Sequence, residues 1–157
     1  MRISLSKAAI LVATLWMGSC ATKPFARTEG PVRNQATSVA LVGQSCDREI
    51  DPNWPRADVL GLDVRVRVAN SGASVLTFDP ARTVLSAAGQ SYGPHRSDSA
   101  SAIPLSASRT FVVHFLEREG DLACNVPMSL ALDQAVTLSG TPVTFGPISF
   151  LASDDDI

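Results

Sequence analysis

The chain holds three cysteines and two histidines, which are its residues best suited to nucleophilic, redox or metal chemistry. Cys20 follows an apolar stretch near the N-terminus, whereas Cys46 and Cys124 lie in the body of the chain. No two of them form a Cys-x-x-Cys pair, so their spacing does not predict a thiol redox site. For the cysteines, this leaves modification of Cys20, and either a disulfide or two reduced thiols for Cys46 and Cys124.

The first nineteen residues have the plan of a secretory signal peptide. Arg2 and Lys7 flank an apolar stretch at 8–17, which is too short for the roughly 20 residues that cross a bilayer. Met17-Gly18-Ser19-Cys20 resembles the lipobox of bacterial lipoproteins, with Met17 in place of the usual leucine. The resemblance implies cleavage before Cys20 and lipidation of its thiol, which anchors the chain in a membrane. Two alternatives stay open, namely cleavage after Ala21 with release into the periplasm, and an uncleaved anchor.

The residue after the cysteine bears on which membrane holds the anchor. In Gram-negative lipoproteins an aspartate at that place usually signals retention in the inner membrane, and this chain has Ala21 there. The resemblance therefore implies an outer-membrane anchor that faces the periplasm.

Residues 20–37 show neither a strand period nor a helix period, and they include Pro24 and Gly30-Pro31. We expect a flexible linker here, with a reach of roughly 20–25 Å. The alternative is that part of it packs on the domain through Phe25 or Val32. The chain thus divides into a signal peptide at 1–19, the lipidated cysteine and linker at 20–37, a folded body at 38–152, and an acidic tail at 153–157.

The folded body shows the two-residue period of β-strands. Apolar and polar or small residues alternate from Leu60 to Ala69, which predicts a half-buried strand, and residues 110–116 place Phe111, Val113 and Phe115 on one face. Further strands are expected at 39–42, 75–78, 83–86, 91–92, 128–132, 135–138 and 142–151, with a hairpin turn at Gly89. About seven or eight short strands at these intervals are typical of an antiparallel β-sandwich.

The order of turns and core positions resembles the immunoglobulin-like domains found in many bacterial lipoproteins. The resemblance covers residues 59–151 and depends on Val66-Arg-Val-Ala-Asn70-Ser-Gly, Phe78-Asp-Pro, Leu85, Gly89-x-x-Tyr92, Pro104-Leu and Phe111-x-x-x-Phe115. It implies an immunoglobulin-like β-sandwich and says little about function. The chain departs from antibody domains because Trp54 lies only eight residues after Cys46, and Tyr92 is not two residues before Cys124.

Once Cys20 is assigned to lipid, Cys46 and Cys124 remain as an even pair, and in an exported chain such a pair more often forms a disulfide. This bond would close a loop of nearly eighty residues and stabilise the fold by roughly 4–5 kcal/mol. The alternative is a pair of buried, reduced cysteines.

Neither histidine predicts a catalytic or metal site. His95 lies with Asp98 in a serine-rich loop between Pro94 and Pro104, and His114 lies in the middle of a strand, where a hydrogen-bonded or surface-facing histidine is expected. No Gly-x-Ser-x-Gly elbow is present and no metal-ligand spacing is seen. We therefore assign no catalytic residue, no metal ligand and no cofactor, and we do not expect an enzyme.

Composition and charge narrow the classes of partner. With 45% hydrophobic and 18% charged residues the chain is globular, and its formal net charge of −2 without a basic cluster argues against nucleic acid. We expect a non-catalytic binding or structural module of the cell envelope, with a protein or polymer partner contacted through Arg65 and Arg67 or through the Pro94–Pro104 loop.

The alternative function is a periplasmic small-ligand or metal-binding protein that uses the loop around His95 and Asp98. A pocket lined by His95, His114 or Asp98 would favour this alternative. A filled core with a bare edge strand would favour the binding module instead.

Overall fold

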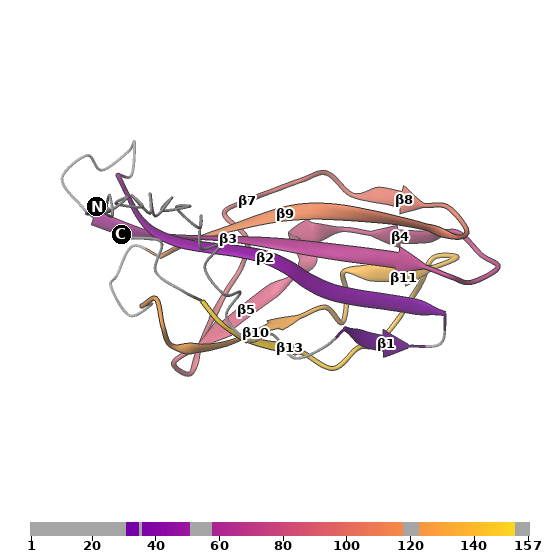
Figure 1. The fold of residues 1–157 in the computed structure, drawn as a ribbon. Helices are drawn as coiled ribbons and strands as arrows, with labels where there is room; N and C mark the ends of the chain where they lie inside the picture. Colours follow the sequence, from indigo (N-terminus) through magenta and orange to yellow (C-terminus); the bar gives the residue numbers. More distant parts are fainter. Residues whose placement is uncertain (1–30, 35, 51–57, 118–122, 153–157) are drawn as a thin grey trace, which may run out of the picture.

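The computed structural model describes residues 31–34, 36–50, 58–117 and 123–152, most of them in antiparallel β-strands (Figure 1). The alternating segment around Val64 forms the centre of the largest sheet. There β3 (Asp58–Asn70) pairs with β2 (Thr37–Ile50) on one side and with β9 (Ala107–Glu117) on the other. The short strands β1 (Val32–Asn34) and β7 (Arg96–Ser97) complete this main sheet, in the order β1-β2-β3-β9-β7.

Two four-stranded sheets form the remainder of the fold. The second sheet has the order β13-β10-β5-β6, with β13 at Ile148–Leu151, β10 at Pro127–Ala131, β5 at Val84–Ala87 and β6 at Gln90–Tyr92. The third sheet has the order β12-β11-β4-β8, with β12 at Thr141–Pro142, β11 at Val136–Leu138, β4 at Leu76–Phe78 and β8 at Ser101–Ile103. A single 3₁₀ turn, η1 (Pro80–Arg82), links β4 to β5 in the described part.

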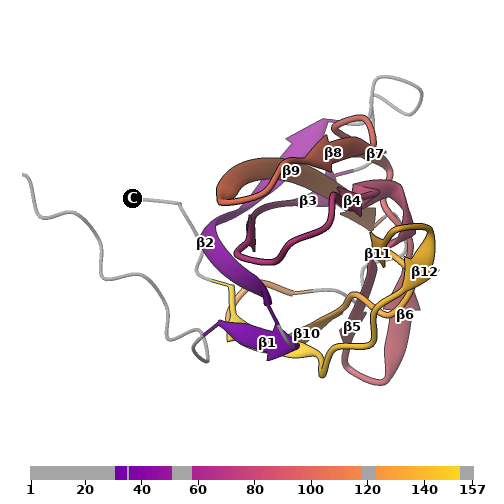
Figure 2. The ribbon, with the colours of Figure 1, turned by 90° about the vertical axis from the view of Figure 1, so that its right-hand side faces the viewer.

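The three sheets enclose one core. Seen from one end, β2, β3 and β9 lie on one side, β5 and β10 lie opposite, and β4 and β11 close the ring between them (Figure 2). Phe111 of the main sheet contacts Phe78 of the third sheet edge to face, with ring centroids 4.8 Å apart. Leu85 and Leu130 of the second sheet are also completely buried. The predicted antiparallel all-β sandwich is confirmed.

The predicted faces of the two longest alternating segments are also confirmed. Leu62, Val64, Val66 and Val68 are fully buried, whereas Arg65 and Arg67 between them are exposed. On β9, Phe111, Val113 and Phe115 are fully buried as expected. The main sheet therefore has one face in the core and one face turned outward.

Two of the tight turns between short strands contain residues with positive φ angles. The predicted turn at Gly89 is present, and both of its central residues have positive φ, with Ala88 at 49° and Gly89 at 81°. Ser139 and Gly140 repeat this arrangement between β11 and β12, with φ of 49° and 83°. Two positive φ angles in a two-residue loop are what a type I′ hairpin turn requires.

The folded body begins earlier than expected. β1 lies inside the segment predicted as a linker, where it pairs with the start of β2, and Val32 packs against the core. The structure also has more described strands than the seven or eight expected, because two- and three-residue strands such as β7, β8 and β12 are too short to give a sequence period. Among the described residues, no helix is long and apolar enough to span a membrane.

Candidate functional site

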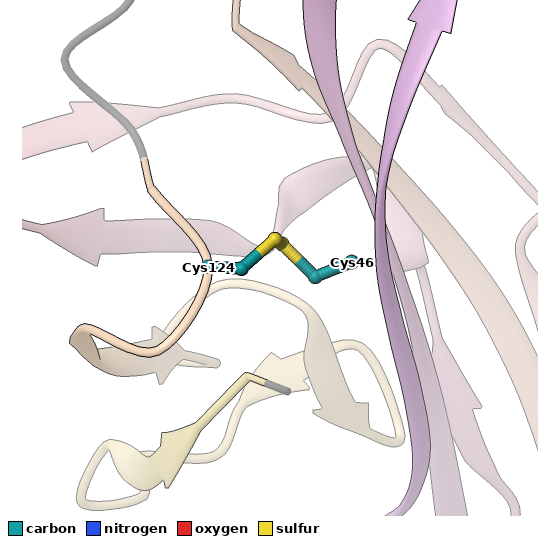
Figure 3. The surroundings of a disulfide bond; sticks show 2 residues. All are labelled: Cys46 and Cys124. Carbon is teal, nitrogen blue, oxygen red and sulfur yellow. A yellow bond between two sulfur atoms is a disulfide. The ribbon is translucent and has the colours of Figure 1, made fainter. Parts of the chain in front are cut away.

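The predicted disulfide between Cys46 and Cys124 is present in the structure (Figure 3). Cys46 lies on β2 with its side chain in the core, and Cys124 lies just before β10 of the second sheet. Their Cα atoms are 5.9 Å apart, although 78 positions separate them in the sequence. The bond therefore joins the main sheet to the second sheet across the core. Cys20, the predicted lipidation site, lies outside the described residues, as does the acidic tail.

His114 is buried on the outward-facing side of its sheet. Its position on β9 alternates with core residues, yet it is only 3% exposed. The short strand β7 pairs beside it, and the His95 ring lies over it with a centroid distance of 5.9 Å. Its Nδ1 lies 2.8 Å from Oδ1 of Asp63 on β3, the partner residue in the register. A strand histidine that is hydrogen-bonded was one of the two expected outcomes.

The loop predicted between Pro94 and Pro104 is largely ordered by pairing. β7 adds to the main sheet beside β9, and β8 adds to the third sheet beside β4. This segment therefore crosses from one layer to the other and closes one side of the sandwich. Asp98 takes part in this closure, since its Oδ2 accepts a hydrogen bond of 2.8 Å from the Val112 N–H. The expectation that this segment is a long irregular stretch is thus corrected.

The histidines do not form a metal centre with their neighbours. His95, His114 and Asp63 gather on the outer face of the main sheet, but the described residues contain no group of three histidine, cysteine or acidic side chains that could hold a metal ion. Asp63 and His114 have the chemical types of an orienting carboxylate and a base. With His114 almost fully buried, however, a substrate would have little access to its ring.

The hollows in the described part of the molecule lie elsewhere. A shallow hollow of about 540 Å³ lies over the second sheet, between the Ala88-Gly89 turn and the end of β13. Its lining is uncharged and includes the exposed Leu151, and a row of serines in register, Ser86, Ser129 and Ser149, crosses it. A second hollow of about 420 Å³ lies beside Arg82 and Asp133, and a smaller one of about 120 Å³ lies near Asn70. None of these three is lined by His95, His114 or Asp98.

Arg65 and Arg67 project from the outer face of the main sheet, as predicted. The Arg67 guanidinium donates to the Ser108 hydroxyl from Nη2 at 3.0 Å and from Nε at 3.3 Å. Arg65 lies across the irregularity between Leu41 and Gly43 in β2, where a Cβ on Gly43 would come within 3.0 Å of Arg65 Cδ. Gly43 thus leaves the space that the Arg65 side chain occupies.

The sequence did not predict the pairing of Asp63 or the strand position of Arg33 on this face. Asp63 was placed correctly on the outer face, but its pairing with His114 depends on the register of β3 against β9, which a single sequence does not reveal. Arg33 was assigned to the linker, although it is an exposed residue of β1. The alternation of Val32, Arg33 and Asn34 is too short to have signalled a strand.

Comparisons with known proteins show the fold of the chain. No protein-family model matches it, and no curated protein matches it in sequence. A candidate lipoprotein of Bacillus subtilis, ycdA, matches 82% of this chain with a TM-score of 0.53 and 14% identity. This chain spans 40% of the length of that protein. The Northeast Structural Genomics Consortium target SoR45 matches 77% of this chain and 89% of its own length, with a TM-score of 0.51 and 12% identity. At 14% and 12% identity, these two similarities show the fold alone.

Proposed function

We propose that the protein is a lipid-anchored, non-catalytic binding or structural module of the cell envelope. The observation on which this mainly depends is the Cys46–Cys124 disulfide, which joins the two layers of a sandwich whose core is filled by large apolar side chains. A structural disulfide of this kind persists in oxidising compartments, and proteins reach these by export. The signal-peptide pattern before Cys20 supplies that route.

We further propose the site of lipidation, the type of domain and the membrane that holds the anchor. Cys20 is the lipidated residue, the domain is immunoglobulin-like, and the anchor lies in the outer membrane with the domain in the periplasm. The fold that this chain shares with a candidate lipoprotein is compatible with such a role, although the likeness concerns the fold alone. The partner is an envelope component. A tethered sandwich can contact it through the outer face of the main sheet, and we propose no catalytic centre.

The test compares the native chain with Cys20→Ala in a bacterial host. We expect the native protein to begin at Cys20, to have the added mass of acyl chains, and to sediment with membranes, whereas the variant loses all three properties. A native chain that begins near Thr22 and stays in the soluble fraction would refute the anchor. Cys46→Ala with Cys124→Ala serves as the control, because removal of the disulfide leaves the modified cysteine in place.

A further inference from the structure

Three arginines lie together in one half of the outer face of the main sheet. In the half nearest the start of β2, the register places Arg33, Arg67 and Arg65 on three successive rows across the strands. The residues that share these rows with them are mostly small and uncharged, namely Ser38, Ala69, Ser108, Ala40, Thr110, Gly43 and Val112. Nearer the disulfide, Asp63 lies in the row after Arg65 together with His114 and Arg96, and Asp47 lies beyond it.

These three arginines are exposed, and none of them has an acidic partner among the described residues. Within the part of the chain that the structure describes, no carboxylate forms an ion pair with Arg33, Arg65 or Arg67, and only Arg67 makes a side-chain hydrogen bond, to a neutral hydroxyl. Asp98 stands at the far end of the Arg65 row, where its carboxylate accepts the Val112 N–H. In a protein with more acidic than basic residues, three uncompensated guanidinium groups on one sheet face form a local basic surface.

We propose that this basic surface, formed by Arg33, Arg65 and Arg67, binds the anionic headgroups of the membrane in which the chain is anchored. The inference rests on the proposed lipid anchor at Cys20. Guanidinium groups suit phosphate oxygens because their planar N–H donors can bind two oxygens at once. The sheet presents the three groups on one face, and the small residues around them leave a neighbouring surface room to approach.

The position of the chain entry favours a membrane over an acidic protein as the occupant. Arg33 belongs to β1, the edge strand beside β2, and Pro31 lies directly before this strand (Figure 2). The ten residues between Cys20 and Pro31 can span at most about 33–36 Å. A lipid on Cys20 would therefore hold the basic surface close to the headgroups at a high effective concentration. Partly exposed Val42 and Val112 border the same region and could contact the interface.

The experiment measures binding to vesicles without the help of the lipid anchor. The mature chain from residue 20, with Cys20→Ala, is mixed with phosphatidylglycerol vesicles or with phosphatidylcholine vesicles, and the partition coefficient is measured by co-sedimentation. We expect binding to the anionic vesicles only, and loss of that binding in concentrated salt. The variant Arg33→Gln, Arg65→Gln, Arg67→Gln should bind on the order of fivefold more weakly per arginine, and so roughly a hundredfold more weakly in all.

A second triple variant has the same net charge as the first. Arg82→Gln, Arg96→Gln and Arg109→Gln remove three exposed arginines outside the basic surface, of which Arg96 lies on β7 at the opposite edge of the main sheet. This control should lower the partition coefficient less than about threefold. An equal loss in both triple variants would show a dependence on net charge and overturn the local surface. Failure of the unsubstituted chain to bind phosphatidylglycerol would overturn it as well. Neither result affects the lipid anchor, because the mass of the native chain tests that separately.

Discussion

The side chains of this protein that have chemical capacity are largely engaged by the fold itself. Cys46 is bonded to Cys124, His114 is buried against Asp63, and the Asp98 carboxylate accepts a backbone N–H. Each of these contacts joins segments that are distant in sequence. At the residue scale they therefore stabilise the sandwich, and among the described side chains the exposed Arg33, Arg65 and Arg67 of the main sheet remain without an acidic partner.

The disulfide should make a large contribution to the free energy of unfolding. Replacing both partners, with Cys46→Ala and Cys124→Ala, should lower it by about 4–5 kcal/mol, because the bond closes a long loop in the unfolded chain. Urea unfolding followed by circular dichroism measures the difference, and adding a reductant to the unsubstituted protein should give a similar loss. Cys20→Ala is the control and should leave the unfolding midpoint unchanged. A loss below about 1 kcal/mol would show that the bond does not limit the unfolded state.

At the scale of elements, the turns show where residue type determines the connection. The Ala88-Gly89 loop needs positive φ at both positions, and glycine adopts such an angle without the steric cost of a Cβ. Gly93 lies close by, just after β6, and differs in one respect. A Cβ would meet no atom within 4 Å at either glycine, but only Gly89 has positive φ.

This contrast gives a matched pair of variants. Gly89→Ala should destabilise the protein by about 1 kcal/mol, because alanine is strained at this φ, whereas Gly93→Ala should change stability by less than about 0.5 kcal/mol. Thermal unfolding of both variants beside the parent chain measures the difference. If Gly93→Ala proved as costly as Gly89→Ala, the backbone angle would not be the cause.

The sequence predicted the two segments with the clearest period, but of β2 (Thr37–Ile50) it predicted only residues 39–42. Alternation over 60–69 and 110–116 placed β3 and β9 and assigned their buried faces correctly, because each has several apolar residues in one row. It did not reveal β1, β7 or β8, which have only two or three residues each and pair with a neighbouring strand. The burial of His114 and the basic surface were missed for the same reason, since β7 covers the first and β1 supplies Arg33 to the second.

At the scale of the whole molecule, the three sheets share a single set of buried side chains. Phe111 belongs to the main sheet, Leu130 to the second and Phe78 to the third, and all are fully buried in one cluster. The disulfide adds a covalent link between the first two sheets. No sheet has a core of its own, so the three sheets should unfold together.

Cooperative unfolding can be tested with one variant in each of two sheets. Phe111→Ala in the main sheet should cost about 3–5 kcal/mol and Leu130→Ala in the second sheet about 2–5 kcal/mol, since each leaves a cavity in the same core. Both should move one unfolding transition, with far-UV and near-UV circular dichroism giving the same midpoint. The exposed position Val112→Ala, next to Phe111 on β9, should shift that midpoint little. Two separate transitions in the Leu130 variant would instead mean that the second sheet unfolds first, while the main sheet and its outward arginines remain folded.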